Sequence, residues 1–167
     1  MEIETHPHSP FSPLPLKTLI VGSFPGRADT LSKDPANNWF YSAVRSQFWK
    51  IMTLALELPL PDTNAKMAAL SSRGIGIADI LLQISRKKAT NADQDLIVIA
   101  YNKKAFSKIL KDHPNVRVCF TSRFVEKHFI KCFPDYTNTC LLPSPSARYA
   151  KLSLQQKAAV YKELLLG

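Results

Sequence analysis

The sequence has few cysteines and no long apolar run. Its three cysteines, Cys119, Cys132 and Cys140, are an odd number and form no CxxC pair. We therefore expect reduced thiols in a cytoplasmic protein rather than a disulfide framework or a zinc or iron–sulfur site. Apolar runs such as 96–101 are far too short to span a bilayer, and the first residues contain no apolar signal core. We expect neither a membrane partner nor export.

Two common phosphate-binding motifs are also missing. The glycine-containing stretch GSFPG at residues 22–26 is not followed by GK[ST], which excludes a phosphate-binding loop of the Walker type. It does not form a GxGxxG fingerprint either, so the usual dinucleotide-binding turn is excluded. No metal or organic cofactor is expected.

Acidic residues are scarce relative to basic ones. Lys and Arg number 22 against 13 Asp and Glu, which gives a net charge of +9. Such an excess favours binding to a polyanion such as nucleic acid, because basic side chains neutralise phosphates and release counterions. A merely basic soluble protein is the alternative interpretation.

The length and hydrophobic content predict one globular domain. The chain has 167 residues, of which 46% are hydrophobic, enough for a single core. Residues 1–16 are rich in proline and are expected to form an extended arm with no helix or ladder of its own. Residues 17–167 are expected to form the domain.

Apolar patterns along the domain alternate between strands and helices, which predicts an α/β fold with a parallel sheet covered on both faces. The segment 95–100 is ambiguous between strand and helix, and 26–38 is expected to be a long polar loop. Strands are expected at 17–23, 116–121 and 139–142, with a glycine-punctuated apolar segment at 74–80. Helices are expected from about residue 46 to the prolines at 59 and 61, and over 64–73, 101–112, 122–131 and 153–166.

Two loops of similar composition follow strands that are far apart in sequence. GSFPG at 22–26 follows the first strand, and LPSPSARY at 142–149 follows the last. Ligands of parallel sheets bind beyond the carboxyl ends of the strands, so we expect both loops to line one cleft. Each loop taken alone is equally consistent with a structural turn.

An aromatic segment, WFYSAVRSQFW at 39–49, lies between these loops in sequence. Phe48 and Trp49 are expected to pack in the core of the following helix. Trp39, Phe40 and Tyr41 come just before it, where they could stack on a nucleobase. Packing of these rings against the sheet edge is the alternative.

The order of these motifs resembles that of the uracil-DNA glycosylase superfamily. LPSPSARYA is similar to the loop with which mismatch-specific thymine and uracil glycosylases hold phosphates and enter the duplex. GSFPG together with FYSAVRSQFWKIM looks more like the hypoxanthine-DNA glycosylase branch. With GIGIADI at 74–80, the resemblance spans most of residues 17–150.

The resemblance implies a three-layer α/β/α domain with a short, mainly parallel four-stranded sheet, and a target base that is flipped out of DNA. Tyr41 would stack on that base, Ser144 and Ser146 would hold phosphates, and Arg148 would fill the vacated space. The implied substrate-binding residues are Gly22, Ser23, Phe24, Pro25, Gly26, Phe40 and Tyr41. The implied DNA-binding residues are Ser144, Pro145, Ser146, Ala147 and Arg148.

The sequence departs from the family where a water-holding asparagine is expected. Phe24 occupies that position in the first motif, and Ser46 occupies the corresponding position of the second. Asp79 and Asn38 are the remaining polar candidates, and Ser46 and Asp79 are our predicted catalytic residues. Asp79 could act as a base or as an electrostatic partner of a cationic sugar, or it could be a structural acid.

Two further polar residues, Asn91 and Asp93, could read a base edge, although capping a turn is the preferred interpretation. The predicted function is a monomeric, monofunctional DNA glycosylase that hydrolyses uracil or hypoxanthine from DNA in the cytoplasm, at the nucleoid in a bacterium. A catalytically inactive DNA-binding domain is the alternative. An enzyme acting on free nucleosides is a third hypothesis.

Overall fold

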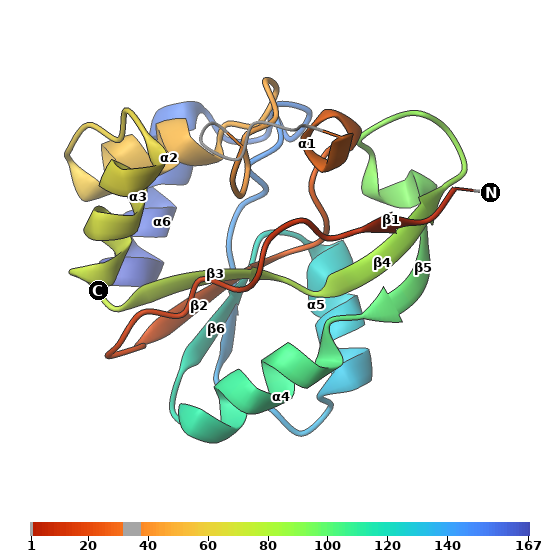
Figure 1. Ribbon diagram of the computed structural model, residues 1–167. Helices are drawn as coiled ribbons and strands as arrows, with labels where there is room; N and C mark the ends of the chain where they lie inside the picture. Colours follow the sequence, from red (N-terminus) through yellow and green to blue (C-terminus); the bar gives the residue numbers. More distant parts are fainter. Residues whose placement is uncertain (1, 32–37) are drawn as a thin grey trace.

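The computed structural model describes residues 2–31 and 38–167. Its centre is a four-stranded parallel sheet in the order β3-β2-β6-β7 (Figure 1). The strands are β2 (Thr18–Gly22), β3 (Ile75–Asp79), β6 (Arg117–Phe120) and β7 (Thr139–Leu141). The predicted α/β class and four-stranded sheet are confirmed.

Successive side chains of the central strands enter two different cores. Ile20 packs in one apolar cluster, while its neighbours Leu19 and Val21 pack in the other. Cys119 alternates in the same way with Val118. A strand buried on both faces therefore reads as the continuous apolar run seen in the sequence.

Helices cover both faces of the sheet and give the three expected layers. Figure 1 shows one group beside the sheet and the other below it. The first group packs around Phe48 and Tyr161, and the second around Phe106 and Phe129. The first consists of α2 (Phe48–Leu56), α3 (Thr63–Ser71) and α6 (Leu154–Leu166), and the second of α4 (Lys103–Asp112) and α5 (Arg123–Cys132).

Local signals fix several helix ends. The hydroxyl of Ser122 accepts a hydrogen bond from Val125 N and caps α5, as the sequence predicts. Ser153 and Gln156 form a capping box at the start of α6. Gly74 follows α3 with a φ of +65°, a conformation that favours glycine.

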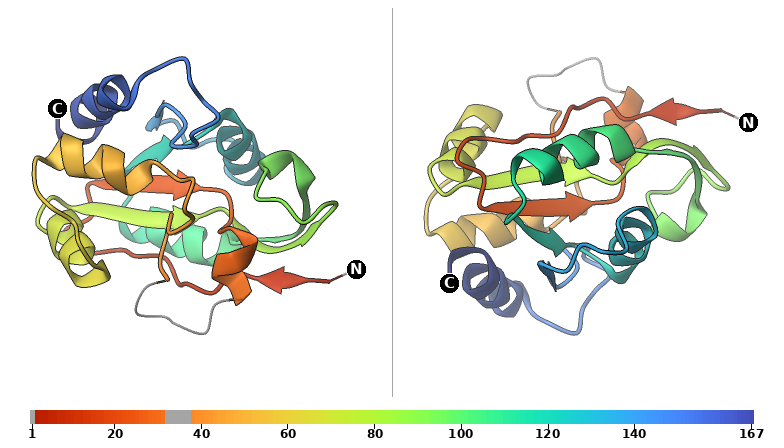
Figure 2. Two further views of the ribbon diagram at one scale, coloured as in Figure 1. Left: turned by 90° about the horizontal axis from the view of Figure 1, so that it is seen from above. Right: turned by 90° about the horizontal axis from the view of Figure 1, so that it is seen from below.

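The N-terminal arm forms a ladder, so the prediction that it has none is wrong. Strand β1 (Glu4–Thr5) pairs with β4 (Leu81–Arg86), which in turn pairs with β5 (Leu96–Tyr101) in a second, antiparallel sheet. The apolar sequence at 95–100 is thereby resolved as strand. Figure 2 shows the arm running beside β3 and β4.

The predicted loop at 26–38 begins with a short helix, α1 (Arg27–Leu31). Residues 32–37 of that segment lie outside the described residues. A 3-10 turn, η1 (Asp93–Asp95), lies between β4 and β5. Asp93 and Gln94 of η1 line the cleft described below, and α1 begins directly after Gly26, which also lines it.

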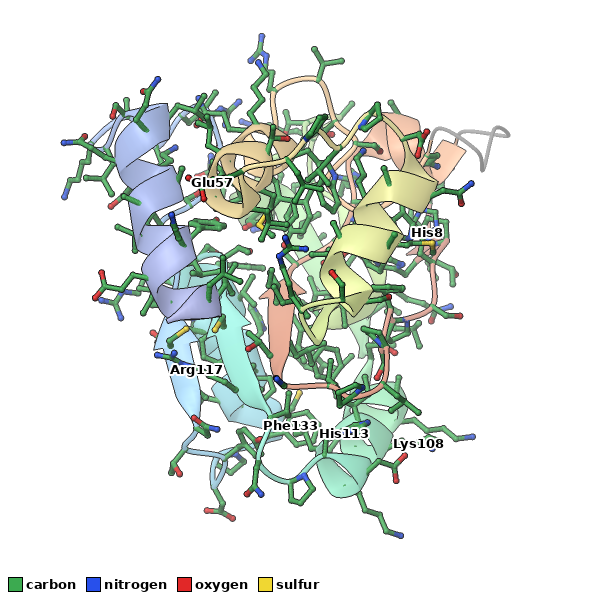
Figure 3. The ribbon with its side chains drawn as sticks, turned by 90° about the vertical axis from the view of Figure 1, so that its left-hand side faces the viewer. His8, Glu57, Lys108, His113, Arg117 and Phe133 are labelled. Carbon is green, nitrogen blue, oxygen red and sulfur yellow. The ribbon has the colours of Figure 1, made fainter. Side chains whose placement is uncertain are left out.

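The opposite end of the molecule has a smaller hollow of about 320 Å³, lined by Leu16, Lys17, His113, Pro114, Asn115 and Val116. His113 and Phe133 follow the last residues of α4 and α5 and are labelled near that end in Figure 3, and Arg117 lies beside α6. Arg117 Nη1 donates a hydrogen bond to the carbonyl of Leu164 at 2.9 Å, which fastens β6 to the end of α6.

The three cysteines are free thiols. Within the described ranges, no helix has the length and apolar character needed to cross a bilayer.

Candidate active site

Both proline-containing loops line one cleft, as predicted. Its volume is about 750 Å³, within the range of about 300–1,000 Å³ that is usual for ligand sites. The first loop contributes Ser23, Phe24, Pro25 and Gly26. The last loop contributes Ser144, Pro145, Ser146, Ala147 and Arg148. Other walls come from Tyr41, Ala43, Arg45, Ser46, Asp79, Ala89, Thr90, Asn91, Ala92, Asp93, Gln94, Thr121, Ser122 and Phe124.

The segment before α2 and the last loop are hydrogen-bonded to each other. Ser46 and Ser146 form an isolated antiparallel bridge. The backbone N–H of Gln47 donates to the carbonyl of Pro145 at 2.8 Å. These bonds join two segments about a hundred residues apart, so one side of the cleft is a single connected rim.

A buried lysine completes this connection. Lys157 Nζ donates to Gln47 Oε1 at 2.8 Å and to the carbonyl of Ser146 at 3.1 Å. Lys157 is only 1% exposed, and its burial lowers the pKa of the ammonium group. The Tyr161 hydroxyl donates to the carbonyl of Pro143 at 2.7 Å. Helix α6 therefore holds the last loop in place.

Gly22, a predicted substrate-binding residue, does not line the cleft, because the side chains of Asp79 and Tyr41, which do line it, cover Gly22. A Cβ atom at this position would lie 2.5 Å from Asp79 Oδ1 and closer still to the hydroxyl oxygen of Tyr41. Gly22 ends β2 and is paired in register with Asp79, the last residue of β3. The glycine is needed here for close approach rather than for a turn.

Asp79 is buried at the end of β3 and is held by a histidine of the arm. It is 6% exposed, and its Oδ2 lies 2.7 Å from Nε2 of His6. Its backbone carbonyl accepts a hydrogen bond from Asn102 Nδ2 at 3.2 Å. Asp79 also lines the cleft.

Tyr41 lies between the core and the cleft. Phe48 stacks on its ring with a centroid separation of 3.9 Å, and its hydroxyl donates to Thr121 Oγ1 at 3.4 Å. Its φ of +59° is in the left-handed region. Burial, helped by the negative charge of Asp79, raises the pKa of Tyr41 well above its ordinary value, so the phenol stays neutral.

A second carboxylate, Asp93, faces the same cleft from η1. Its Oδ1 accepts a hydrogen bond from Ser23 Oγ at 2.7 Å. Burial raises the pKa of Asp93. The hydrogen bond from Ser23 opposes this increase, and the charge of Asp79 reinforces it.

Asn91 instead acts as a cap, since its Oδ1 accepts a hydrogen bond from Arg27 N at 3.0 Å, at the start of α1. The capping interpretation holds for Asn91, whereas Asp93 belongs to the cleft.

The serines of the last loop shape its backbone. Ser144 Oγ accepts from Ser146 N, and Ser146 Oγ accepts from Arg148 N, each at 3.2 Å. Their hydroxyl hydrogens are left to donate to an anion. Pro145 is buried, whereas Arg148 is exposed at the tip. This arrangement suits contact with a phosphate backbone.

Phe40 is a correction to the predicted binding residues. It is 2% exposed and packs in the core, edge-on to Trp39. Hydrophobic burial turns this ring inward, so it cannot stack on a bound base. The third candidate for holding water, Asn38, is also buried, with its Oδ1 accepting from Ser42 Oγ at 3.3 Å.

Ser46 does line the cleft, and its hydroxyl also serves the start of α2. Ser46 Oγ accepts a hydrogen bond from Phe48 N at 3.3 Å. The hydroxyl hydrogen can still donate toward the cleft. Its predicted catalytic role stays a prediction.

The first loop is fastened to the arm through Arg86. Its Nη2 donates to the carbonyl of Pro25 at 2.9 Å, and its Nε donates to Glu4 Oε2 at 2.7 Å. Burial alone would raise the pKa of Glu4, but hydrogen bonds from Arg86 and Thr30 lower it overall. This buried ion pair fixes the wall of the cleft near Phe24, whose ring lies 5.9 Å from the Arg86 guanidinium.

Charge is distributed unevenly over the cleft. Carboxylates of Asp79 and Asp93 lie at its base, whereas Arg45 and Arg148 lie on its exposed rim. An anionic backbone would therefore be attracted to the rim, and a cationic group to the base. In the part of the chain that the structure describes, His, Cys, Asp and Glu form no cluster of three suited to a metal ion.

Comparison with solved structures identifies the architecture. The chain is similar to a protein from Methanosarcina acetivorans described as a "putative Uracil DNA glycosylase", whose structure was solved in solution by NMR. The TM-score is 0.69 at 21% sequence identity, over 98% of this chain and 99% of that one. The two proteins share a fold. No protein-family model and no curated protein matches the sequence.

Three residues in or beside the cleft were not predicted from the sequence. His6 lies within the predicted arm, which was given no role in the site. Capping was the preferred interpretation of Asp93, and Lys157 had no predicted role. The position of Lys157 on the apolar face of α6, next to Ala158 and one turn before Tyr161, is a signal that could have been used. Nothing local to His6 indicates its contact with Asp79.

Proposed function

We propose that the protein is a monofunctional DNA glycosylase that hydrolyses a deaminated base, uracil or hypoxanthine, from DNA. One observation carries the proposal: a buried carboxylate, Asp79, lies at the base of a cleft whose rim bears Arg45 and Arg148. The fold shared with the Methanosarcina protein supports it. DNA is the proposed partner.

The cleft suits a nucleotide that has left the duplex. Flipping a nucleotide out of the duplex costs roughly a few kcal/mol, and least for a mispaired base. Contacts in the pocket must recover this free energy. Tyr41 has one face covered by Phe48 and lines the cleft, so it is the proposed stacking partner. Ser144 and Ser146 would hold the flanking phosphates, and Arg148 would contact a phosphate at the edge of the space that the base leaves.

Asp79 is the proposed base in the hydrolysis. The oxygen of a water molecule bonds to C1′ of the sugar as the C1′–N bond breaks. The electron pair of that bond leaves with the base, and the water proton passes to Asp79. The carboxylates of Asp79 and Asp93 also stabilise the positive charge that develops on the sugar. Backbone N–H groups of the loop 22–26 would stabilise the departing base.

A lesion panel tests the proposal. Duplexes with a single uracil or hypoxanthine, paired or mispaired, are incubated with the protein and treated with alkali, and strand breakage at the lesion is measured. We expect breakage for at least one base, with more product from a mispair. Release of the free base, measured by chromatography, distinguishes excision from nuclease cleavage.

A second candidate function is DNA binding without catalysis. The ring of Phe24, which takes the place of a water-holding side chain, packs edge-on to His6 with centroids 5.4 Å apart and offers no hydrogen bond. Retention of lesion duplexes with no breakage anywhere in the panel would favour this function. Activity on free nucleosides but not on DNA would favour neither.

A further inference from the structure

We infer that His6 is a positioning residue for Asp79, so that the N-terminal arm is part of the catalytic apparatus. This inference rests on the proposed function and deepens it. It assigns to His6 the task of fixing which oxygen of Asp79 faces the cleft. His6 itself does not line the cleft.

The contact between the two side chains is short and buried. His6 Nε2 lies 2.7 Å from Asp79 Oδ2, and the side chains are 1% and 7% exposed. Hydrogen bonds to a carboxylate are stronger than bonds between neutral groups, more so where water is excluded. The contact therefore holds the carboxylate in one orientation.

The protonation pattern of His6 follows from its other nitrogen. The backbone N–H of His8 donates to Nδ1 of His6 at 3.0 Å, so Nδ1 carries a lone pair rather than a proton. Nε2 must then carry the hydrogen of a neutral ring, and it donates that hydrogen to Asp79. The arm thus supplies both the ring and the bond that selects its tautomer.

The arm is pinned on both sides of His6. Glu4 pairs with Ile84 of β4, and Phe11 pairs with Ile77 of β3, both in the antiparallel sense. The two arm residues and their two partners are each seven residues apart, so the register is the same at both points. Between these points His6 N donates to the carbonyl of Leu82 at 2.8 Å. The backbone of His6 therefore has a fixed register relative to Asp79.

Aromatic neighbours fix the plane of the ring. Phe24 packs edge-on against His6, and Phe40 lies 5.7 Å away, centroid to centroid. Both rings therefore have a structural role beside His6, although Phe24 also lines the cleft whereas Phe40 does not. The imidazole is held by packing as well as by hydrogen bonds.

The two carboxylate oxygens of Asp79 therefore have different surroundings. Oδ2 is occupied by His6, while Oδ1 crosses over Gly22 beside the Tyr41 hydroxyl. Without His6 the carboxylate could rotate about its side-chain bonds. Since a misplacement of about 1 Å can cost about a hundredfold in rate, loss of His6 should lower kcat by about tenfold to a hundredfold.

Two variants of His6 and one control test this. His6→Ala removes the donor, whereas His6→Gln places an amide N–H near the position of Nε2. Thr5→Ala is the control, because Thr5 is the adjacent arm residue and its hydroxyl accepts a hydrogen bond from the Gln83 side chain at 3.1 Å, at the surface. Rates on the best duplex of the lesion panel, thermal midpoints and affinity for an abasic-site duplex are measured for each.

We expect His6→Ala to lose kcat with little change in KM or in affinity for the abasic duplex, and His6→Gln to recover most of the loss. Thr5→Ala should match the wild type. A His6→Ala variant with wild-type kcat overturns the inference while leaving the proposed function intact. A wild type that releases no base from any duplex overturns both.

The ring nitrogens give a test that does not require a folded variant. In the wild-type protein, long-range nitrogen–proton NMR correlations should show the Nε2–H tautomer for His6. Observation of the Nδ1–H tautomer would overturn the inference even if His6→Ala unfolds.

Discussion

Lys157 and Gln47 are 110 residues apart in sequence, yet the ammonium group of one donates to the side-chain oxygen of the other at 2.8 Å. The same ammonium group also donates to the carbonyl of Ser146. One buried cation of α6 thereby ties the start of α2 to the last loop. The rim that would grip DNA depends on a residue that does not line the cleft.

Lys157→Met should weaken this rim. The substitution keeps the length of the side chain but leaves the oxygens of Gln47 and Ser146 without their donor, so the free energy of unfolding should fall by about 1–3 kcal/mol. Urea denaturation measures the change. Lys162→Met, on the exposed side of the same helix, is the control and should shift stability by less than about 0.5 kcal/mol. Equal stability of Lys157→Met and wild type would contradict the role given to Lys157.

Gly22→Ala should disrupt the packing of Tyr41 and Asp79 beneath the cleft. The new methyl group collides with the Tyr41 hydroxyl and Asp79 Oδ1, and overpacking of this kind costs about 1–3 kcal/mol. Adding Tyr41→Phe removes one of the two colliding atoms, so the double variant should regain part of the stability lost by Gly22→Ala. Chemical denaturation of Gly22→Ala, Tyr41→Phe and the double variant measures this. Additive losses would show that the close approach is absent.

Asp93→Asn should gain stability relative to the wild type as pH rises. The pKa of Asp93 is raised by burial above its ordinary value of 3.8, so the folded wild type binds more protons than the unfolded chain between 3.8 and the raised pKa. The stability that this group contributes therefore falls as pH rises through that window, whereas the amide of the variant does not titrate. Unfolding free energies of both proteins at pH 4 and pH 7 measure the difference. A difference that is independent of pH would contradict the buried position of Asp93.

Arg148→Ala should weaken binding to duplex DNA equally for all sequences. Each cation that contacts a phosphate contributes about one unit to the slope of log affinity against log salt concentration, so the slope should fall by about one. Fluorescence titrations at several salt concentrations measure it. Lys111→Ala, at the far end of α4, is the control and should leave the slope unchanged. An unchanged slope for Arg148→Ala would place that side chain away from the phosphates.

Elements with strong local signals are predictable from the sequence. The run VRVCFT becomes β6, and Ser122 caps the helix after it, because burial on both faces and the cap are both encoded within a few residues. The meeting of the two proline loops also follows from a general property of parallel sheets.

Contacts between distant segments are not encoded locally. β4, LLQISR, and the ladder with the arm were missed because an edge pairing depends on where another segment lies. Phe40 has an aromatic ring that could stack on a base, but the core buries its apolar surface. His6 reaches Asp79 across 73 residues, and only the register of the arm determines that contact.

The most direct test of the account compares wild type and Asp79→Asn under single-turnover conditions. Release of free uracil or hypoxanthine from a lesion duplex is measured with enzyme in excess, together with affinity for the abasic product duplex. Asn keeps the size of the side chain but cannot accept the water proton, so we predict a fall in rate of about a hundredfold or more at nearly unchanged affinity. An Asp79→Asn variant that releases the base as fast as the wild type would contradict it.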